Sequence, residues 1–77
     1  MTIEINIDLF TTLTRYYPKG SGSLKVEKGT TAAGLIRKLG IPDGSVSLIF
    51  INGKRVLPDR KLAENDKVGL FPLVAGG

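Results

Sequence analysis

The residues most clearly able to take part in a chemical reaction lie at the end of the chain, where Gly76 and Gly77 follow the short apolar run 71–75. A carboxylate is a poor electrophile until it is activated, and the activated Gly77 carboxylate would be an acyl donor. Glycine has no side chain and a permissive backbone, so the pair can enter a channel too narrow for a Cβ. Chain ends are also commonly accessible. We expect residues 74–77 to form a flexible tail; a chance glycine pair is the alternative.

Other chemistries have little support, because the chain contains no cysteine and no histidine. Thiol nucleophiles and imidazole bases or metal ligands are therefore missing. Asp59, Glu64 and Asp66 form the nearest approach to a carboxylate cluster, but their spacing is not that of a calcium loop. The segment 20–23 lacks the ending of a phosphate-binding loop. We expect turn and capping roles for these residues, with no metal, no bound cofactor and no catalytic residue.

The composition predicts a single small globular domain of 77 residues, with 42% hydrophobic and 23% charged residues. No apolar run is long enough for a membrane span, and the N-terminal residues lack a signal-peptide pattern. We therefore expect a cytoplasmic protein without membrane association. The net charge is +4, but the basic residues form dyads rather than a block and are not interleaved with stacking aromatics. Nucleic acid is not an expected partner.

The first third of the chain predicts two antiparallel strands. Residues 2–10 alternate, with the apolar side chains on one face. Phe10 continues this period on the polar face, unless the strand stops before it. A helical turn is expected in 11–17, followed by a loop over 19–23 and a second strand over 24–27.

A short amphipathic helix should follow, with Thr30 or Thr31 as its N-cap. Its apolar residues recur at helical spacing and are Ala32, Leu35, Ile36 and Leu39. Gly40 and Pro42 end it. Gly34 inside the helix suggests close packing on the sheet.

The last third predicts three strands. Residues 46–51 lead through the turn pair Asn52 and Gly53 into a short strand over 54–57. The run 48–51 is unbroken, so its buried face cannot be decided. The final strand covers 67–73 and, if Val68 faces inward, Phe71 faces outward.

This order of elements, ending in an apolar strand and two glycines, resembles the β-grasp fold of ubiquitin-like proteins, and most closely the ThiS/MoaD family of sulfur carriers. The similarity spans the whole chain, through the segments 7–10, 31–35, 51–54, 62–68 and 71–77. It implies an α+β fold, with a mixed sheet of four to five strands and one main helix packed on one face. The single domain would cover 1–73 and the Gly-Gly tail 74–77.

Within the family, Pro72 after Phe71 is most similar to the molybdopterin synthase small subunit. Two features differ from that branch: residues 15–18 replace its usual Arg-Glu turn, and the following loop is rich in glycine and serine.

The resemblance implies a carrier rather than an enzyme. A ubiquitin-activating-type adenylyltransferase would use ATP to adenylate Gly77, and a persulfide donor would convert the product to a thiocarboxylate. A larger molybdopterin synthase subunit, or another sulfur-accepting enzyme, would consume it. Gly76 and Ala75 would thread into the partner's channel behind Gly77.

Docking is expected through an apolar patch at the root of the tail. Strands one and five are neighbours in a β-grasp fold, so Phe10 and Phe71 would share one surface, and such surfaces often bind partners. Pro72, Leu73 and Val74 would extend it. The alternative is that one or both rings pack into the core or against a loop.

Three other functions stay open at this stage. The chain would be a thiamin-pathway sulfur carrier if another enzyme accepts the sulfur, or a ubiquitin-like modifier if a lysine attacks activated Gly77. A non-catalytic β-grasp interaction module is the alternative of a different class.

Overall fold

The computed structural model describes residues 1–16, 21–42 and 44–72. Its elements, in chain order, are β1 (Thr2–Leu9), the 3-10 helix η1 (Thr11–Tyr16), β2 (Ser21–Glu27), α1 (Ala32–Lys38), β3 (Val46–Ile51), β4 (Lys54–Val56) and β5 (Lys67–Pro72). None of the helices in these ranges has the length and apolar character needed to cross a membrane.

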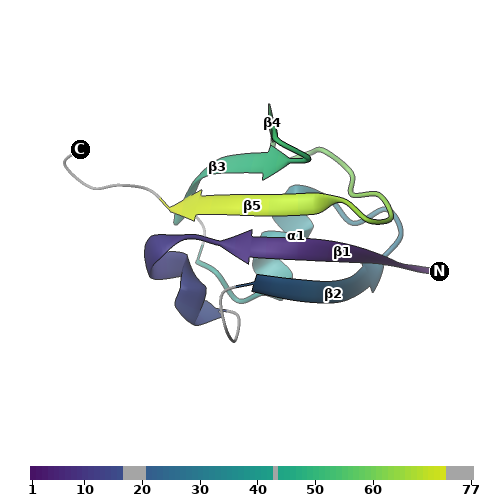
Figure 1. Cartoon of the computed structure of the whole chain (residues 1–77), viewed down its shortest axis with the longest axis horizontal. Helices are drawn as coiled ribbons and strands as arrows, with labels where there is room; N and C mark the ends of the chain where they lie inside the picture. The colour runs from purple at the N-terminus through teal and green to yellow at the C-terminus, as the bar shows by residue number, and fades with distance from the viewer. Residues whose placement is uncertain (17–20, 43, 73–77) are drawn as a thin grey trace.

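The strands form one mixed sheet in the order β2-β1-β5-β3-β4. β1 and β5 run parallel in its centre, while β2, β3 and β4 pair antiparallel with their neighbours. In Figure 1 the helix α1 lies behind the sheet, so the described residues form two layers and leave the other sheet face uncovered. The predicted fold class, a mixed sheet with one main helix on one face, is confirmed, with five strands.

The core lies between α1 and the inner face of the sheet. The alternation predicted for the first strand is present, since Ile5, Ile7 and Leu9 are 0–4% exposed and the residues between them are exposed. The helix contributes Ala32 and Leu35, both fully buried. Burying an isoleucine, leucine or valine side chain contributes about 1.5–3 kcal/mol, so the inner face supplies most of the stability.

Helix α1 begins as predicted, with Thr31 as its N-cap. The Thr31 hydroxyl accepts a hydrogen bond from the Gly34 backbone N–H at 3.1 Å. The expectation that Gly34 packs closely on the sheet is wrong, because a Cβ there would meet only Thr30 and Thr31 within 4 Å. The helix ends where Gly40 adopts a φ of +79°, a conformation that glycine adopts readily.

The predicted loop over 19–23 is wrong at its end, because Ser21 to Ser23 belong to β2. Ser21 pairs with Asp8, and Ser23 pairs with Asn6. Small residues have weak strand preference, but β1 offers them a continuous row of backbone partners, and this pairing overrides the local signal. Residues 17–20 lie outside the described residues.

The Asn52–Gly53 hairpin is confirmed. Asn52 has a φ of 54° and Gly53 a φ of 83°, the positive values that a two-residue type I′ turn requires. The turn fixes the pairing of β3 with β4, in which Ile51, Phe50 and Ile49 lie opposite Lys54, Arg55 and Val56.

A polar cluster ties this hairpin to the start of β5. Asp66 is only 5% exposed and accepts hydrogen bonds from Asn52 Nδ2 at 2.9 Å and from the Ala63 N–H at 2.8 Å. The Lys67 N–H in turn donates to Asn52 Oδ1. The turn role expected for Asp66 is confirmed. Within the described ranges, no group of acidic residues is arranged to hold a metal ion.

Candidate functional site

The uncovered face of the sheet carries all three phenylalanines of the chain, Phe10, Phe50 and Phe71, which we call the phenylalanine cluster. They come from the end of β1, from β3 and from β5. β5 alternates, so Leu70 is fully buried on the inner face and Phe71 lies on the outer one. The Phe10 N–H donates to the Leu70 carbonyl at 3.3 Å, which continues the β1–β5 pairing one residue past the end of β1.

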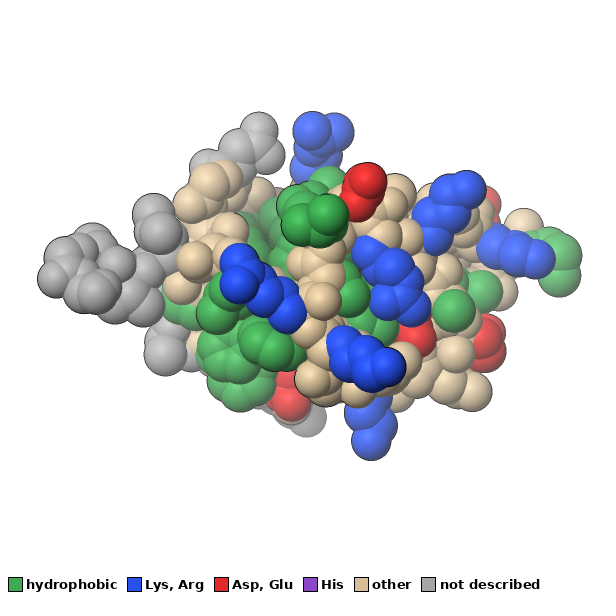
Figure 2. Space-filling model, turned by 90° about the horizontal axis from the view of Figure 1, so that it is seen from above, with side chains coloured by type: hydrophobic (Ala, Val, Ile, Leu, Met, Phe, Trp, Pro, Cys, Tyr) green, Lys and Arg blue, Asp and Glu red, His purple; other side chains and the backbone are tan. Residues whose placement is uncertain are grey.

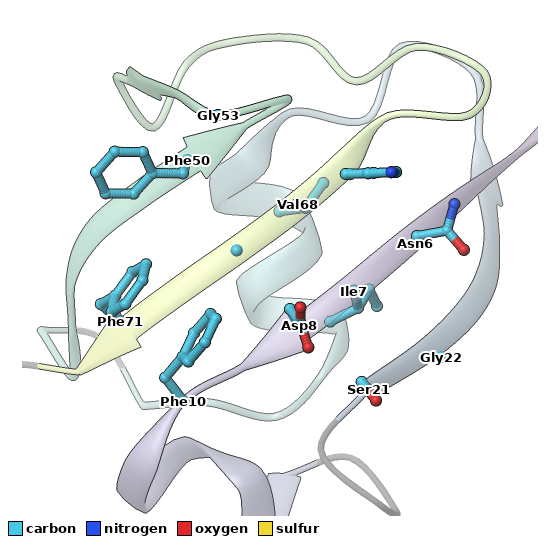
Figure 3. Close-up of a pocket in the computed structure, with 12 residues that line it drawn as sticks. Asn6, Ile7, Asp8, Phe10, Ser21, Gly22, Phe50, Gly53, Val68 and Phe71 are labelled. Atoms are coloured by element: carbon cyan, nitrogen blue, oxygen red, sulfur yellow. The ribbon is translucent and has the colours of Figure 1, made fainter.

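The three rings contact one another in an ordered way. Phe10 and Phe71 stack, with ring centroids 4.3 Å apart and planes inclined by 3°. Phe50 meets Phe71 edge to face, at 5.5 Å and 72°. Each ring is half-buried, because the rings shield one another while their outer surfaces face solvent (Figure 3). Such pairs contribute about 0.5–1.5 kcal/mol beyond area burial, so the cluster is a preformed surface.

Gly69 forms the floor beneath the rings. It is the cross-strand partner of both Asp8 and Phe50. A Cβ at this position would lie 3.5 Å from Phe10 Cε2 and 3.8 Å from Phe71 Cε1. The missing side chain therefore leaves a depression in the middle of the outer face.

This depression opens into a groove of about 580 Å³. Its apolar end is the phenylalanine cluster, and Asn6 and Ser21 lie away from the rings (Figure 3). Asp8 and Lys67 are the charged residues of its lining. The volume lies within the range of ligand-sized pockets. A surface with an apolar end and a polar end suits docking of a partner, since the apolar part supplies affinity and the polar part sets orientation.

The model of the ThiS family matches residues 7–77, which is nearly the full chain. The chain belongs to the ThiS family. Members of this ThiS/MoaD group are small carrier proteins of ubiquitin fold, sulfur carriers or small modifiers, and not catalysts.

Solved structures agree with this ThiS-family fold. The Haloferax volcanii HVO 2177 protein has a TM-score of 0.80 at 27% identity, over 99% of this chain and 88% of that one. A putative molybdopterin converting factor subunit 1 from Pyrococcus furiosus has a TM-score of 0.75 at 21% identity, over 94% and 99%. Small archaeal modifier protein 1 of H. volcanii has a TM-score of 0.74 at 17% identity, over 94% and 99%.

These likenesses establish a ubiquitin-like β-grasp fold for this ThiS-family chain. Among curated protein sequences, a search finds no match.

The structure brings together two of the residues predicted to dock a partner. Phe10 and Phe71 lie on one outer patch, as expected, and the alternative that either packs into the core is wrong. Pro72 ends β5, half-buried and opposite Val46 on β3. The remaining predicted site residues, Leu73, Val74, Ala75, Gly76 and Gly77, lie outside the described residues.

Phe50 was missed, although the sequence carries a signal for it. The Asn52–Gly53 turn fixes the hairpin register, and the short strand after it shows a polar Arg55 beside an apolar Val56. Cross-strand partners share a face. Phe50 therefore had to follow Arg55 outward, and Ile49 had to follow Val56 inward.

Proposed function

We propose that this chain carries sulfur as a thiocarboxylate on Gly77 and donates it in molybdopterin biosynthesis. The observation that carries the proposal is the family match, which extends through the Gly-Gly pair to the last residue. β5 leads into this segment and presents Phe71 on the uncovered face of the sheet. The folded domain would then bind the partner enzyme, and the terminal carboxylate would react.

The proposed chemistry proceeds in three balanced steps. A Gly77 carboxylate oxygen attacks the α-phosphorus of ATP in an activating enzyme, which forms the acyl-adenylate and releases pyrophosphate. The terminal sulfur of a donor persulfide attacks the acyl carbon and AMP leaves, giving an acyl disulfide. A thiol then attacks the donor's sulfur in this S–S bond, which forms a new disulfide with the donor and releases the thiocarboxylate. Because the chain has no cysteine, other molecules must supply both the persulfide and the thiol.

The phenylalanine cluster is the proposed docking surface for the activating enzyme and for the sulfur acceptor. Phe71 stands six residues before Gly77. Six residues span at most about 20 Å when fully extended, so a partner seated on the cluster would keep its reactive site within that radius. Pro72, Leu73 and Val74 would line the way, and Ala75 and Gly76 would enter the channel behind Gly77.

The molybdopterin assignment rests on the chain's last strand and on one structural neighbour. Pro72 follows Phe71, as in the small subunit of molybdopterin synthase, and the P. furiosus neighbour bears the name of a putative molybdopterin converting factor subunit. The partner that consumes the sulfur would then be a larger synthase subunit.

A ubiquitin-like modifier is the second candidate, favoured by the likeness to small archaeal modifier protein 1. In that case a lysine amine, rather than a persulfide, attacks the activated Gly77. Isopeptide-linked conjugates of the tagged chain in cell lysate would distinguish this function, because a dedicated sulfur carrier forms none.

Mass spectrometry of the intact chain tests the sulfur-carrier proposal. After incubation with a ubiquitin-activating-type adenylyltransferase, ATP and a persulfide donor, the mass should rise by the difference between sulfur and oxygen, and fragmentation should place the change at Gly77. Reactions without ATP, or with a chain lacking Gly76 and Gly77, should show no change. An unchanged mass with an enzyme that adenylates another carrier would contradict the proposal.

A further inference from the structure

The strongest concentration of charge in the sequence lies in β4 and in the segment that follows it, residues 54–61, which we call the basic edge. It contains four basic residues and one acidic residue, Asp59. These eight residues therefore carry +3 of the chain's net +4, while the other 69 residues hold seven basic and six acidic groups. The basic members are Lys54, Arg55, Arg60 and Lys61.

These four basic side chains are exposed, and none forms a salt bridge within the described residues, where Met1 with Glu27 is the recorded pair. Figure 2 looks onto this side of the molecule and shows Lys and Arg side chains outnumbering acidic ones, with hydrophobic side chains between them. Their charge is therefore available to an external anion.

Leu57 adds an apolar contact to the middle of this charged segment. Its side chain is 72% exposed. Among the described residues, Met1 is the other large hydrophobic residue that is exposed. A single exposed leucine is ordinary. Here, however, it follows Arg55 by two residues and precedes Arg60 by three, which combines apolar and ionic contacts in one place.

The backbone of the basic edge is held on the body. The Pro58 carbonyl accepts from the Ala33 N–H, and the Arg60 carbonyl accepts from the Ala32 N–H, each at 2.9 Å, at the start of α1. The Arg60 N–H donates to the Leu57 carbonyl at 3.1 Å. A surface whose backbone is already ordered loses little conformational entropy on binding.

Protection of a sheet edge explains part of this arrangement. β4 is the last strand of the sheet, and lysine and arginine commonly prevent unwanted pairing at such edges. This reasoning covers Lys54 and Arg55, which lie within β4. It leaves Arg60, Lys61 and Leu57 unexplained, because they lie beyond the strand.

We propose that the basic edge binds an acidic segment of a partner protein, with an apolar side chain of that segment resting on Leu57. Its negative charge complements a surface whose four basic side chains form no salt bridge within the described residues. Arg55 is the cross-strand neighbour of Phe50, so the edge adjoins the phenylalanine cluster, and one partner can cover both. The edge acts without the terminal carboxylate and is therefore independent of the function proposed above.

A protein segment fits better than a nucleic acid. A phosphate backbone gains nothing from the exposed Leu57 side chain, whereas a protein segment can place an apolar side chain against it. The net +3 is also small beside the six or more phosphate contacts that are common in nucleic-acid binding.

The test is an NMR titration of the isotope-labelled full chain with a short synthetic peptide in which leucines alternate with glutamates. Amide shifts should concentrate in residues 54–61, and the affinity should fall several-fold between about 0.05 and 0.5 M salt, since screening shortens to a few ångströms over this range. A matched peptide with lysine in place of glutamate should not bind. Absence of shifts at the basic edge overturns the proposal.

Two charge-reversed variants locate the contact. Arg60→Glu with Lys61→Glu should weaken binding about tenfold, whereas Lys25→Glu with Lys28→Glu, the same charge change on the exposed β2 side, should leave it within about twofold. Folding should survive, because the recorded hydrogen bonds of residues 60 and 61 involve their backbone. Equal loss in both variants overturns the proposal.

Three further experiments test the contribution of Leu57, the contribution of the C-terminal glycines and the class of ligand. Leu57→Ser should weaken binding several-fold with an unchanged salt dependence. A chain lacking Gly76 and Gly77 should bind the peptide with full affinity, whatever becomes of the sulfur-carrier function. Tighter binding of a single-stranded oligonucleotide at the same residues would overturn the choice of a protein partner.

Discussion

The two faces of the sheet carry different kinds of hydrophobic residue, although these residues are neighbours in the sequence. On the inner face the buried hydrophobic side chains of the described residues are all aliphatic. On the outer face stand all three phenylalanines, half-buried against one another. Leu70 and Phe71 are adjacent in β5, yet the first is fully buried and the second faces the groove.

This division shows that the largest apolar side chains of the chain are not used to build its core. Phenylalanine buries about 150–250 Å² and usually dominates core energetics. Here α1 packs on a layer of isoleucine, leucine and valine, and the rings gather where nothing of the described chain covers them. The inner face therefore provides stability, and the outer face is the surface that we propose for docking another protein.

The sharpest test of the division is a pair of alanine substitutions in β5. Leu70→Ala should lower the free energy of unfolding by about 2–5 kcal/mol, because it leaves a cavity in the core. Phe71→Ala removes a larger side chain but should cost only about 1–2 kcal/mol, because that ring is half-exposed and loses mainly its contacts with Phe10 and Phe50. Urea denaturation measures both values.

An equal loss of unfolding free energy in the two variants would contradict this difference between the faces, since Phe71 would then stabilise the protein as a core residue does. Met1→Ala is a suitable control, because its side chain is 94% exposed and should change stability by less than about 0.5 kcal/mol.

Asp66 is the next largest expected effect and links the two faces. It is buried and holds the Asn52 side chain, which fixes the hairpin carrying Phe50 against β5. Asp66→Ala should cost about 2–3 kcal/mol, because the Asn52 amide and the Ala63 N–H lose their acceptor.

Thermal unfolding would measure this cost, with Asp59→Ala on the exposed side of the chain as the matched control. A loss in the Asp59 variant as large as that in the Asp66 variant would show that the effect is one of net charge.

Substitutions of Gly69 should change the stability least and should alter the shape of the outer face only locally. A Cβ at this position makes ordinary contacts at 3.5 Å or more, so Gly69→Ala should fold with a stability within about 1 kcal/mol of the original. The two extra methyl groups of Gly69→Val should separate Phe10 from Phe71.

Ring-current shifts of the two aromatic side chains in NMR spectra would detect this separation. Unchanged shifts in Gly69→Val would mean that the rings do not depend on the glycine floor. The alanine variant serves as the control for the backbone effect of replacing glycine.

The fold was largely predictable because most elements carry a period that one face imposes. β1 alternates since its outer side chains meet water, and α1 shows helical spacing with a threonine cap. The loop predicted for Ser21 to Ser23 was wrong, because their strand forms by pairing with β1 and has no apolar pattern of its own. The close packing on the sheet predicted for Gly34 was wrong, because the neighbours of Gly34 belong to the helix cap.

The site was predictable only in part. Phe10 and Phe71 follow from strand parity and from the adjacency of the first and last strands. Phe50 required the hairpin register, since the run around it is apolar on both faces. Gly69 as a floor could not be predicted, because it depends on three strands meeting at one point. The roles of Gly77, Gly76 and Ala75 stay predictions.

The most direct test of the account measures activation by a ubiquitin-activating-type adenylyltransferase, through exchange of ATP with labelled pyrophosphate at varied concentrations of the chain. The Phe10→Ala, Phe71→Ala double variant, shown by denaturation to be folded, should need at least about tenfold more protein for half-maximal exchange, as expected on losing the centre of an interface. The half-buried Leu24→Ala, on β2, should behave like the original chain. Full activity of the double variant at unchanged concentration would contradict the claim that the outer face exists to dock a partner.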